Sequence, residues 1–426
     1  MSELLQAVRG MSDVRPEHSY LWRFLEQTFA ECVLSYGYRE IRMPILESTA
    51  LFKRSIGEIT DIVEKEMYTF IDRNGDSLSL RPEGTAGCVR ACIEHGLLHN
   101  QQQKLWYVGP MFRHEKPQKG RYRQFHQCGV EVFGIEGVAI ELELIVLCRR
   151  LWRCLGIEKH VNLEVNTLGT IQERQAYREQ LIAYFKQHYA ALDEDSVRRL
   201  EKNPMRILDS KNEALKPLIE NAPKLFDVLS EESRCYFNRL CHGLEALGIE
   251  FTVNPCLVRG LDYYEHTVFE WTTSLLGSQA TVSAGGRFDK LVEHLGGKPT
   301  PAVGFALGEE RLLLLCEQVS AVLPAERLPT VFMMPDMTHG MVYALTLAEE
   351  LRQKAPTWLV QVNMTGGSFK SQFKKADKSG ARVALIIGED EVREGTVSIK
   401  DLRTSKPQQI VPQTEVFGTI CAYMGE

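Results

Sequence analysis

Two strand-like segments joined by a short basic loop constrain the fold of this chain most strongly. Residues Leu105 to Arg113 and Gln124 to Phe133 both show the period-two alternation of β-strands that have two different faces. We interpret them as an antiparallel pair connected by the loop His114 to Arg123, which predicts a largely antiparallel sheet at the centre of the fold. The odd-numbered positions then share one face: Tyr107, Gly109, Met111, Arg113, Phe125, Gln127, Gly129, Glu131 and Phe133.

This shared face has the composition of a binding floor. It combines polar groups and aromatic rings, and its two glycines leave space between them. The opposite face of the second strand is apolar and suits packing against helices (Cys128, Val130 and Val132). The alternative is a half-exposed hairpin with solvated charges, which the intervening glycines disfavour. The loop His114 to Arg123 is basic and contains a tyrosine, a composition that suits phosphates and a stacked base.

A second informative stretch runs from Leu257 to Tyr264, immediately before an alternating segment, Thr267 to Trp271, that predicts a strand. Arg259 stands next to a glycine, so an anion could approach both the side chain and the backbone. Because successive strand residues point to opposite faces, we expect that Tyr263 and Tyr264 are not both in the core. The alternative is a turn entering a sheet, with the arginine in solvent.

The rest of the chain predicts two folding units. Apolar residues at helical spacing predict a helix from Glu17 to Ser35, and a strand from Tyr38 to Ile45 follows it. Further along, we expect a helix over residues 86–93 with Thr85 as its N-cap. Residues 171–247 are helix-rich and charged, which predicts an inserted helical module. Two prolines near residue 325 mark a boundary, beyond which strands and helices alternate as in a small α/β domain with a mainly parallel sheet. We therefore expect domains at 1–325, including the insertion, and at 329–426.

Composition excludes few classes of protein. The chain has 426 residues and a net charge of −6. Its overall charge therefore gives no indication of a nucleic-acid partner. Its eleven cysteines form no Cys-x-x-Cys pair, which indicates a reducing compartment and no certain metal site. We see neither a signal peptide nor an apolar run of membrane-spanning length, so we expect a cytoplasmic protein with no membrane partner. The glycine motifs of P-loop and dinucleotide-binding proteins do not occur.

Several segments resemble the motifs of class II aminoacyl-tRNA synthetases, in the same order. Ile41 to Ile45 resembles motif 1, a dimer-interface element. The loop His114 to Arg123, bracketed by Arg113 and Phe125, resembles motif 2, and Gly304 to Arg311 resembles motif 3, whose arginine binds ATP. Leu80 to Thr85 looks like the segment that holds the α-amino group of the amino acid. Leu257 to Tyr264 resembles the histidine-specific motif of the histidyl-tRNA synthetases, bacterial type.

The last domain continues the resemblance. Gly366-Gly367-Ser368-Phe369-Lys370, Ala376-Asp377 and Gly380-Ala381 look like the anticodon-binding domain of the same enzymes. In this domain, the groups that would contact the anticodon arm include Lys370, Lys374, Lys375 and Arg382.

The resemblance implies an α+β catalytic domain on a mostly antiparallel sheet flanked by helices, with a helical insertion and a C-terminal α/β anticodon-binding domain. It also implies histidine–tRNA ligase activity that uses ATP and Mg²⁺, with L-histidine and tRNA(His) as substrates and a homodimer as the assembly. Arg113 and Arg259 would flank the α-phosphate, and Arg311 would hold the distal phosphates. Further ATP contacts would come from Arg121 and from Phe125 stacked on adenine. The implied histidine-binding residues are Glu83, Thr85, Tyr107, Gln127, Glu131, Tyr263 and Tyr264, with Glu131 and Tyr264 reading the imidazole.

Three alternatives stay open at this point. Synthetase-like regulatory paralogues bind histidine without aminoacylation, but they lack the anticodon domain that residues 329–426 resemble. A class II ligase for glycine, threonine or proline is disfavoured by Glu131 together with Arg259, because a glycine or proline pocket has no use for a carboxylate that reads imidazole. A plain RNA-binding protein does not account for Gln127 and Glu131 on one face.

Overall fold

The chain folds into two compact units, Met1–Pro324 and Ala325–Glu426, which we call the N-terminal and C-terminal units. The structure is a computed structural model, and it describes residues 4–57, 60, 62–208, 210, 212–277, 280–319, 321 and 323–424. None of the helices within these ranges is both long and apolar enough to cross a membrane.

An eight-stranded sheet forms the centre of the N-terminal unit, with the strand order β1-β5-β6-β11-β10-β9-β7-β8. Only the outermost pairs, β1–β5 and β7–β8, are parallel, and the pairs between them are antiparallel. The expected mostly antiparallel sheet is therefore confirmed. Its strands are β1 (Arg39–Glu40), β5 (Gln103–Phe112), β6 (Gln124–Phe133), β7 (Asn162–Thr167), β8 (Phe251–Val253), β9 (Glu265–Thr272), β10 (Thr281–Arg287) and β11 (Ala302–Gly308).

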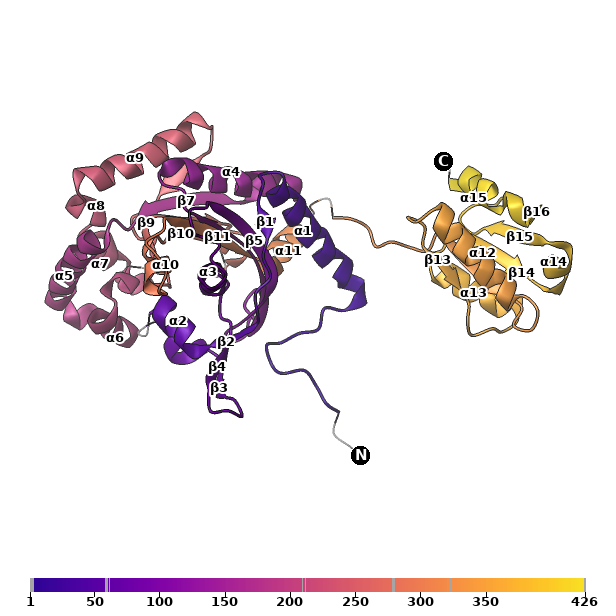
Figure 1. The fold of residues 1–426 in the computed structure, drawn as a ribbon, viewed down its shortest axis with the longest axis horizontal. Coiled ribbons are helices and arrows are strands. Elements are labelled where there is room, and N and C mark those ends of the chain that lie inside the picture. Colours follow the sequence, from indigo (N-terminus) through magenta and orange to yellow (C-terminus); the bar gives the residue numbers. More distant parts are fainter. Residues whose placement is uncertain are drawn as a thin grey trace. The chain divides into compact units, whose positions relative to one another are not determined.

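Helices cover both sides of this sheet. Figure 1 shows the sheet curving around α3, with α1 and α4 on the other side. The apolar even-numbered residues of β6 are buried against that outer layer, as the sequence predicted: Cys128, Val130 and Val132 share a core with α1, α4 and α11. The helices of this part are α1 (Pro16–Leu34), α2 (Thr49–Ile56), α3 (Thr85–Glu94), α4 (Val138–Cys154), α10 (Lys290–His294) and α11 (Glu309–Gln318), with short turns η1 (Ile62–Glu66) and η2 (Glu158–His160).

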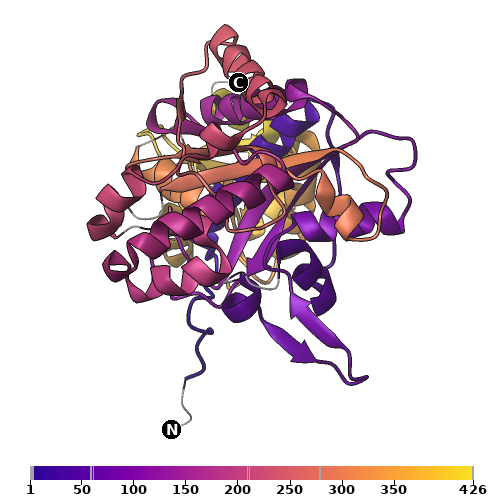
Figure 2. The same cartoon turned by 90° about the vertical axis from the view of Figure 1, so that its left-hand side faces the viewer.

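A small sheet stands apart from the large one. It has the order β2-β4-β3, and its hairpin β3–β4 projects from the unit in Figures 1 and 2. Gly75 has a positive φ of 92° in the connecting turn, as the Asn-Gly pair predicts. The predicted strand over Tyr38 to Ile45 is wrong beyond Glu40, where a proline interrupts the segment at position 44 and lacks an N–H for a ladder. The strands are β2 (Leu46–Ser48), β3 (Thr69–Ile71) and β4 (Ser77–Leu80).

The segment 171–247 is helical, as its sequence predicts. Glu173 ties the start of the first helix of this segment to the start of its last helix. Its carboxylate accepts hydrogen bonds from the backbone N–H groups of Thr170 and Ser230, both at 2.7 Å, and from the Ser233 hydroxyl at 2.8 Å. Burial alone would raise the pKa of Glu173, but these donors lower it to about 2. The helices are α5 (Ile171–Gln187), α6 (Glu194–Lys202), α7 (Lys216–Glu220), α8 (Leu225–Val228) and α9 (Glu231–Ala246), with turns η3 (Tyr189–Ala191), η4 (Pro204–Ile207) and η5 (Glu213–Leu215).

The C-terminal unit contains a five-stranded mixed sheet, β13-β12-β14-β15-β16. The expected mainly parallel sheet is only half right, because β12 is parallel to β13 and β14, whereas β15 and β16 are antiparallel. Only residues 388–395 connect β14 to β15, too few for a parallel crossover of a dozen residues or more. The elements are β12 (Val331–Pro335), α12 (Met341–Lys354), β13 (Val360–Val362), α13 (Phe369–Lys378), β14 (Val383–Ile387), α14 (Glu389–Glu394), β15 (Thr396–Asp401), β16 (Gln409–Pro412), η7 (Gln413–Glu415) and α15 (Val416–Met424).

Candidate active site

The register of β5 and β6 brings the predicted floor together. Met111 pairs with Phe125, Gly109 with Gln127, and Tyr107 with Gly129. A Cβ atom on Gly129 would overlap the Tyr107 ring, and one on Gly84 would overlap the same ring. Glycine is required at these two positions because the tyrosine ring occupies the space of a side chain.

A cavity of about 300 Å³ lies over this floor. It is lined from four distant parts of the sequence: the start of α3, the β5–β6 hairpin, the segment before β9, and the start of α11. Every predicted site residue except Glu131 is on its wall: Glu83, Thr85, Tyr107, Arg113, Arg121, Phe125, Gln127, Arg259, Tyr263, Tyr264 and Arg311.

Glu131 lies beneath the wall rather than on it. Its side chain is 1% exposed, and its Oε1 atom accepts hydrogen bonds from the Thr85 hydroxyl at 2.7 Å and the Tyr107 hydroxyl at 3.0 Å. Its Oε2 atom has no donor among the residues that the structure describes. Burial raises the pKa of this carboxyl well above its usual range. The side chain is therefore a buried acceptor with one oxygen unsatisfied, a costly arrangement unless a ligand supplies a donor.

Glu83, and not Thr85, caps helix α3. The predicted N-cap role of Thr85 is wrong, since the helix begins at Thr85 and no side-chain cap is made by the preceding Gly84. Instead, the Glu83 carboxylate accepts hydrogen bonds from the backbone N–H groups of Thr85 at 2.7 Å and Ala86 at 2.9 Å. This arrangement leaves the Thr85 hydroxyl for Glu131. Burial raises the pKa of Glu83 despite these bonds.

Four arginines face the cavity. The Arg113 Nε atom donates to the Pro82 carbonyl at 2.9 Å, and its guanidinium lies 5.2 Å from the centre of the Phe125 ring. Arg311 donates to the carbonyls of Gly120 at 2.9 Å and Thr281 at 2.7 Å. Arg121 pairs with Glu115. Burial lowers the pKa of Arg113, and burial with the nearby charge of Arg113 lowers that of Arg311.

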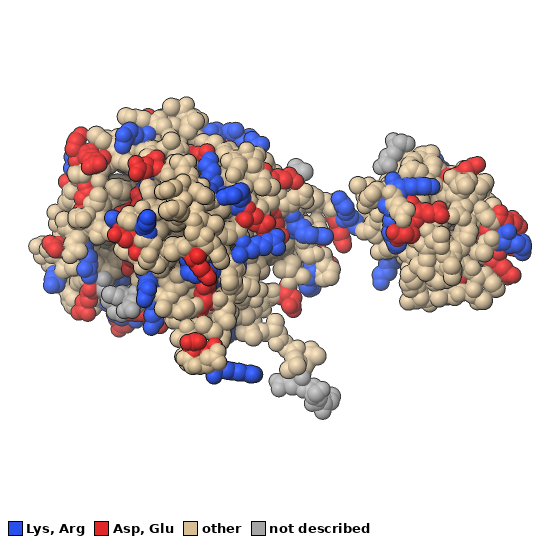
Figure 3. Space-filling view, in the orientation of Figure 1, with Lys and Arg blue, Asp and Glu red and all other residues tan. Residues whose placement is uncertain are grey.

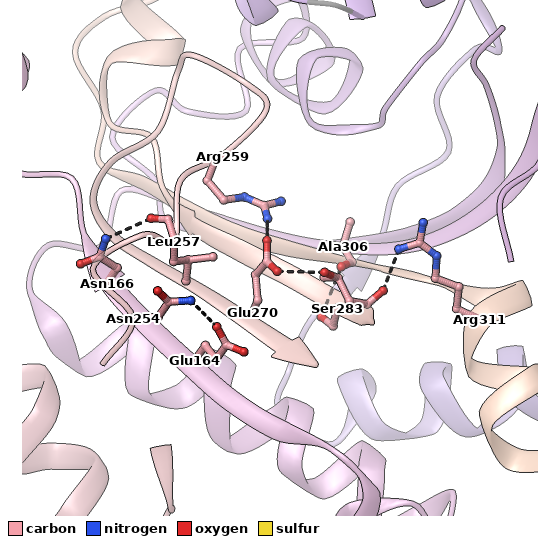
Figure 4. Close-up of polar contacts among 10 residues, drawn as sticks. Glu164, Asn166, Asn254, Leu257, Arg259, Glu270, Ser283, Ala306 and Arg311 are labelled. Carbon is pink, nitrogen blue, oxygen red and sulfur yellow. Dashed lines mark hydrogen bonds and ion pairs between the residues drawn. The ribbon is translucent and has the colours of Figure 1, made fainter. Parts of the chain in front are cut away.

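Arg259 lines the cavity from the segment before β9. It pairs with Glu270 and lies 5.4 Å from the centre of the Tyr264 ring. Its Nε atom has no acceptor within the described part of the chain. The loop before it is tied to β7, because the Asn166 amide donates to the Leu257 carbonyl at 3.0 Å, as Figure 4 shows. Guanidinium groups arranged in this way can neutralise a polyanion such as a chain of phosphates.

Tyr263 and Tyr264 are both buried, so the expectation that they could not share the core is wrong. Each is 5% exposed, both line the cavity, and their ring centres are 4.7 Å apart. The alternation of a strand does not apply to them because β9 begins only at Glu265. The backbone is bent there: His266 has a φ of 49°, and Arg174 donates to the Tyr264 carbonyl.

The sequence analysis missed several residues of the site, among them Glu270 and Thr281. Glu270 and Thr281 line the cavity from neighbouring strands, and the Thr281 hydroxyl donates to Glu270 at 2.9 Å. A carboxylate in the middle of the apolar strand that follows Arg259 is the signal that could have identified Glu270. In the described ranges, no group of three or more His, Cys, Asp or Glu side chains is placed to hold a metal ion.

The face of the molecule drawn in Figure 3 carries charges of both signs. Figure 3 shows acidic and basic side chains interspersed over the drawn face of each unit. The wall of the cavity carries four arginines and four glutamates, so its formal charges balance.

Comparison with known proteins shows the family of the chain. A family model described as histidyl-tRNA synthetase matches residues 10–312, and one described as an anticodon binding domain matches residues 330–422. The chain is 63% identical over 412 residues to a histidine–tRNA ligase from Legionella pneumophila (strain Lens), which covers 97% of both chains.

Solved structures show the same fold. The apo histidyl-tRNA synthetase of S. aureus superimposes with a TM-score of 0.81 at 34% identity, over 98% of this chain and 100% of that one. A Bacillus halodurans protein titled as an ATP phosphoribosyltransferase regulatory subunit/histidyl-tRNA synthetase has a TM-score of 0.64 at 20% identity, over 91% of this chain and 99% of that one, which shows likeness of fold alone. With both family models and this relative covering nearly the whole chain, the protein belongs to the histidyl-tRNA synthetase family.

Proposed function

We propose that this chain is a histidine–tRNA ligase, which activates L-histidine with ATP and transfers it to tRNA(His). One observation carries the proposal: a single cavity joins phosphate-binding arginines to a floor that ends in a buried carboxylate. The arginines suit ATP, and the floor suits a small amino acid with a polar ring. Family membership and the 63% identical relative named a histidine–tRNA ligase support the same activity.

The proposed histidine site uses the unsatisfied acceptors of the floor. Both Gln127 Oε1 and Glu131 Oε2 lack a donor among the described residues, and histidine brings two kinds of donor, an ammonium group and a ring N–H. We assign Gln127, with Glu83 and Thr85, to orientation of the amino acid. Glu131, aligned by Thr85 and Tyr107, would read the imidazole with Tyr264, and Tyr263 would close the wall. A site built to pair with a ring N–H rejects amino acids that lack one.

The proposed ATP site uses the arginines. Arg113 and Arg259 would flank the α-phosphate, Arg311 and Arg121 would neutralise the remaining phosphates, and Phe125 would stack on adenine. The carboxylate oxygen of histidine attacks the α-phosphorus, the bond to the β-phosphate oxygen breaks, and pyrophosphate leaves. A terminal ribose hydroxyl of the tRNA then attacks the histidyl carbonyl, and AMP leaves. The protein contributes orientation and charge neutralisation to both steps.

Mg²⁺ would enter as part of the substrate, bound to the phosphates of ATP. Each of the four carboxylates that line the cavity already has a protein partner. Glu83 accepts from the backbone N–H groups of Thr85 and Ala86, and Glu115 pairs with Arg121. Glu270 is bonded to Arg259 and Thr281, and Glu310 accepts from the backbone N–H of His126 at 2.9 Å. These residues do not form a resident metal site.

The C-terminal unit would bind the anticodon arm. Lys370 and Lys374 are exposed on α13 and are the best of the predicted contacts. Lys375 and Arg382 are weaker candidates because both already donate within the unit: Lys375 to the Thr365 hydroxyl at 2.7 Å, and Arg382 to Asp401 and the Tyr423 carbonyl, both at 3.1 Å.

We also propose a homodimer that forms through the motif 1 segment, residues 41–45, and a cytoplasmic location, where tRNA is charged for translation. The apolar side chains of Ile45 and Leu46 are 42% and 38% exposed next to this segment, which would favour burial against a second copy. Sedimentation equilibrium would test the assembly, and a monomer at micromolar concentration would contradict it.

The deciding experiment is amino-acid-dependent exchange between ATP and pyrophosphate, tested with each standard amino acid and followed by charging of tRNA(His). We expect exchange with histidine alone and charging of the tRNA. The regulatory-paralogue alternative predicts histidine binding with neither exchange nor charging. Exchange with another amino acid would remove the histidine assignment.

A further inference from the structure

The carboxylate of Glu270 connects two walls of the cavity. It lies on β9, with 15% of its side chain exposed, and one oxygen accepts from Arg259 Nη1 while the other accepts from the Thr281 hydroxyl. Figure 4 shows Arg259 approaching Glu270 from the loop above the strand. Both carboxylate oxygens are therefore used, one by a loop and one by the neighbouring strand β10.

Thr281 extends this contact to a second arginine. Its carbonyl accepts from Arg311 Nη1 at 2.7 Å, so a continuous chain of bonds runs from Arg259 through Glu270 and Thr281 to Arg311. The two arginines come from the segment before β9 and from α11, which are separate in sequence. The short link between them runs through the paired strands β9 and β10.

The pairing with Glu270 determines how Arg259 presents its donors. A guanidinium is planar with its N–H groups in a fixed fork, so holding Nη1 on one side sets the direction of the other edge. Nε on that other edge is buried and lacks an acceptor among the described residues. A buried donor in this state is stabilised when a ligand oxygen accepts from it.

We propose that Glu270 is a positioning residue that orients Arg259 toward the reacting phosphate and aligns it with Arg311 through Thr281. The inference rests on the proposed function and deepens it. Glu270 itself would not touch the reacting atoms; it would act through the arginine. A merely structural ion pair would support the fold of β9 without affecting the rate through Arg259, and the two possibilities differ in measurable ways.

The test is a double-mutant cycle between Glu270→Gln and Arg259→His. The readout is the single-turnover rate of histidyl-adenylate formation with saturating histidine, together with KM for histidine and thermal unfolding. Glu164→Gln is the matched control, because Glu164 is paired directly with Glu270 across β7 and β9 but binds Asn254 at 2.6 Å and Thr272 at 3.1 Å instead of an arginine.

We expect Glu270→Gln to slow adenylate formation on the order of tenfold to a hundredfold, the effect of misplacing a catalytic group, with KM for histidine unchanged. In the Arg259→His background, the same substitution should change the rate less than about twofold, since residues that act together are non-additive. Glu270→Asp should restore part of the rate, and Glu164→Gln should match the wild type.

Two results would overturn the inference: a wild-type rate in Glu270→Gln, or an equal loss from this substitution in both backgrounds. If Glu270→Gln is too unstable to assay, Glu270→Asp is measured in the same cycle and judged by the same criterion. Failure of the proposed function has a different signature. If the wild type exchanges with another amino acid, the histidine assignment falls, and the same cycle with that amino acid still decides the role of Glu270, which concerns the phosphate end of the site.

Discussion

Replacing Glu131 with glutamine tests the histidine site with the least disturbance of its surroundings. Glutamine has nearly the same shape as glutamate, so it creates no cavity. Its amide oxygen can keep the two hydrogen bonds that Oε1 now accepts, from Thr85 at 2.7 Å and from Tyr107 at 3.0 Å. The change is therefore confined to the position of Oε2, where an acceptor without a donor becomes an NH₂ group that can only donate.

The expected size of the effect follows from that exchange. In the proposed histidine complex of the wild type, Oε2 accepts the imidazole N–H. In the variant, two donors face each other, and the buried ring N–H loses its partner at a cost of about 1–3 kcal/mol, which is about 5-fold to 150-fold in KM for histidine. The KM for ATP should stay within about twofold, because Glu131 is assigned no phosphate contact. Folding stability should not fall, since burial raises the pKa of this carboxyl and already disfavours its charged form.

The assay is ATP–pyrophosphate exchange with histidine and ATP varied separately, in the wild type, Glu131→Gln and the control Glu164→Gln. The control removes a carboxylate from β7 that does not line the cavity, so it should alter neither KM. Equal increases in the two KM values of Glu131→Gln would refute the assignment. So would an unchanged KM for histidine in a folded protein, because the carboxylate would then not read the ring.

Three further predictions concern other parts of the chain. Arg259→His should reduce adenylate formation about a hundredfold or more through the loss of a charge contact in the transition state, with the fold intact by circular dichroism; near-normal exchange would remove this arginine from the mechanism. Deleting everything after Leu328 should leave histidine activation measurable and reduce tRNA charging, with a weaker salt dependence of the remaining tRNA binding; a folded, dimeric truncation that charges tRNA normally would contradict the role of the C-terminal unit. Burial and the neighbouring charges of Glu26 and Glu310 raise the pKa of Glu309 from its ordinary 4.5 to about 8. The contribution of this carboxyl group to folding stability is therefore fully present below pH 4.5 and is lost as the pH rises through 8. Glu309→Gln should therefore be more stable than the wild type at pH 9 by up to a few kcal/mol and similar at pH 4, measured by urea unfolding; a gap that does not grow with pH would show that Glu309 is not the group responsible.

Local sequence patterns predicted the parts of the fold that depend on alternation and turns. The strands within residues 103–133 and the helices of residues 171–247 agree with the structure because each is determined by short-range periodicity. The turn at Gly75 likewise has the positive φ that an Asn-Gly pair favours. Patterns failed where neighbours in space compete with neighbours in sequence. Thr85 looks like a helix cap, but Glu83 takes that role because the Thr85 hydroxyl is used by Glu131, 46 residues away.

The sequence alone was enough to identify the types of residue in the site and the resemblance of their segments to synthetase motifs. Only the tertiary structure determined how deeply each of these side chains is buried and which partners it bonds to. Glu131 lies under the wall because Thr85 and Tyr107 cover it, and Tyr263 and Tyr264 are both buried because the strand begins after them. The link from Arg259 through Glu270 and Thr281 to Arg311 depends on how β9 and β10 are paired. These residues belong to segments that are separate in the sequence, so the residue spacing within any one segment does not predict their contact.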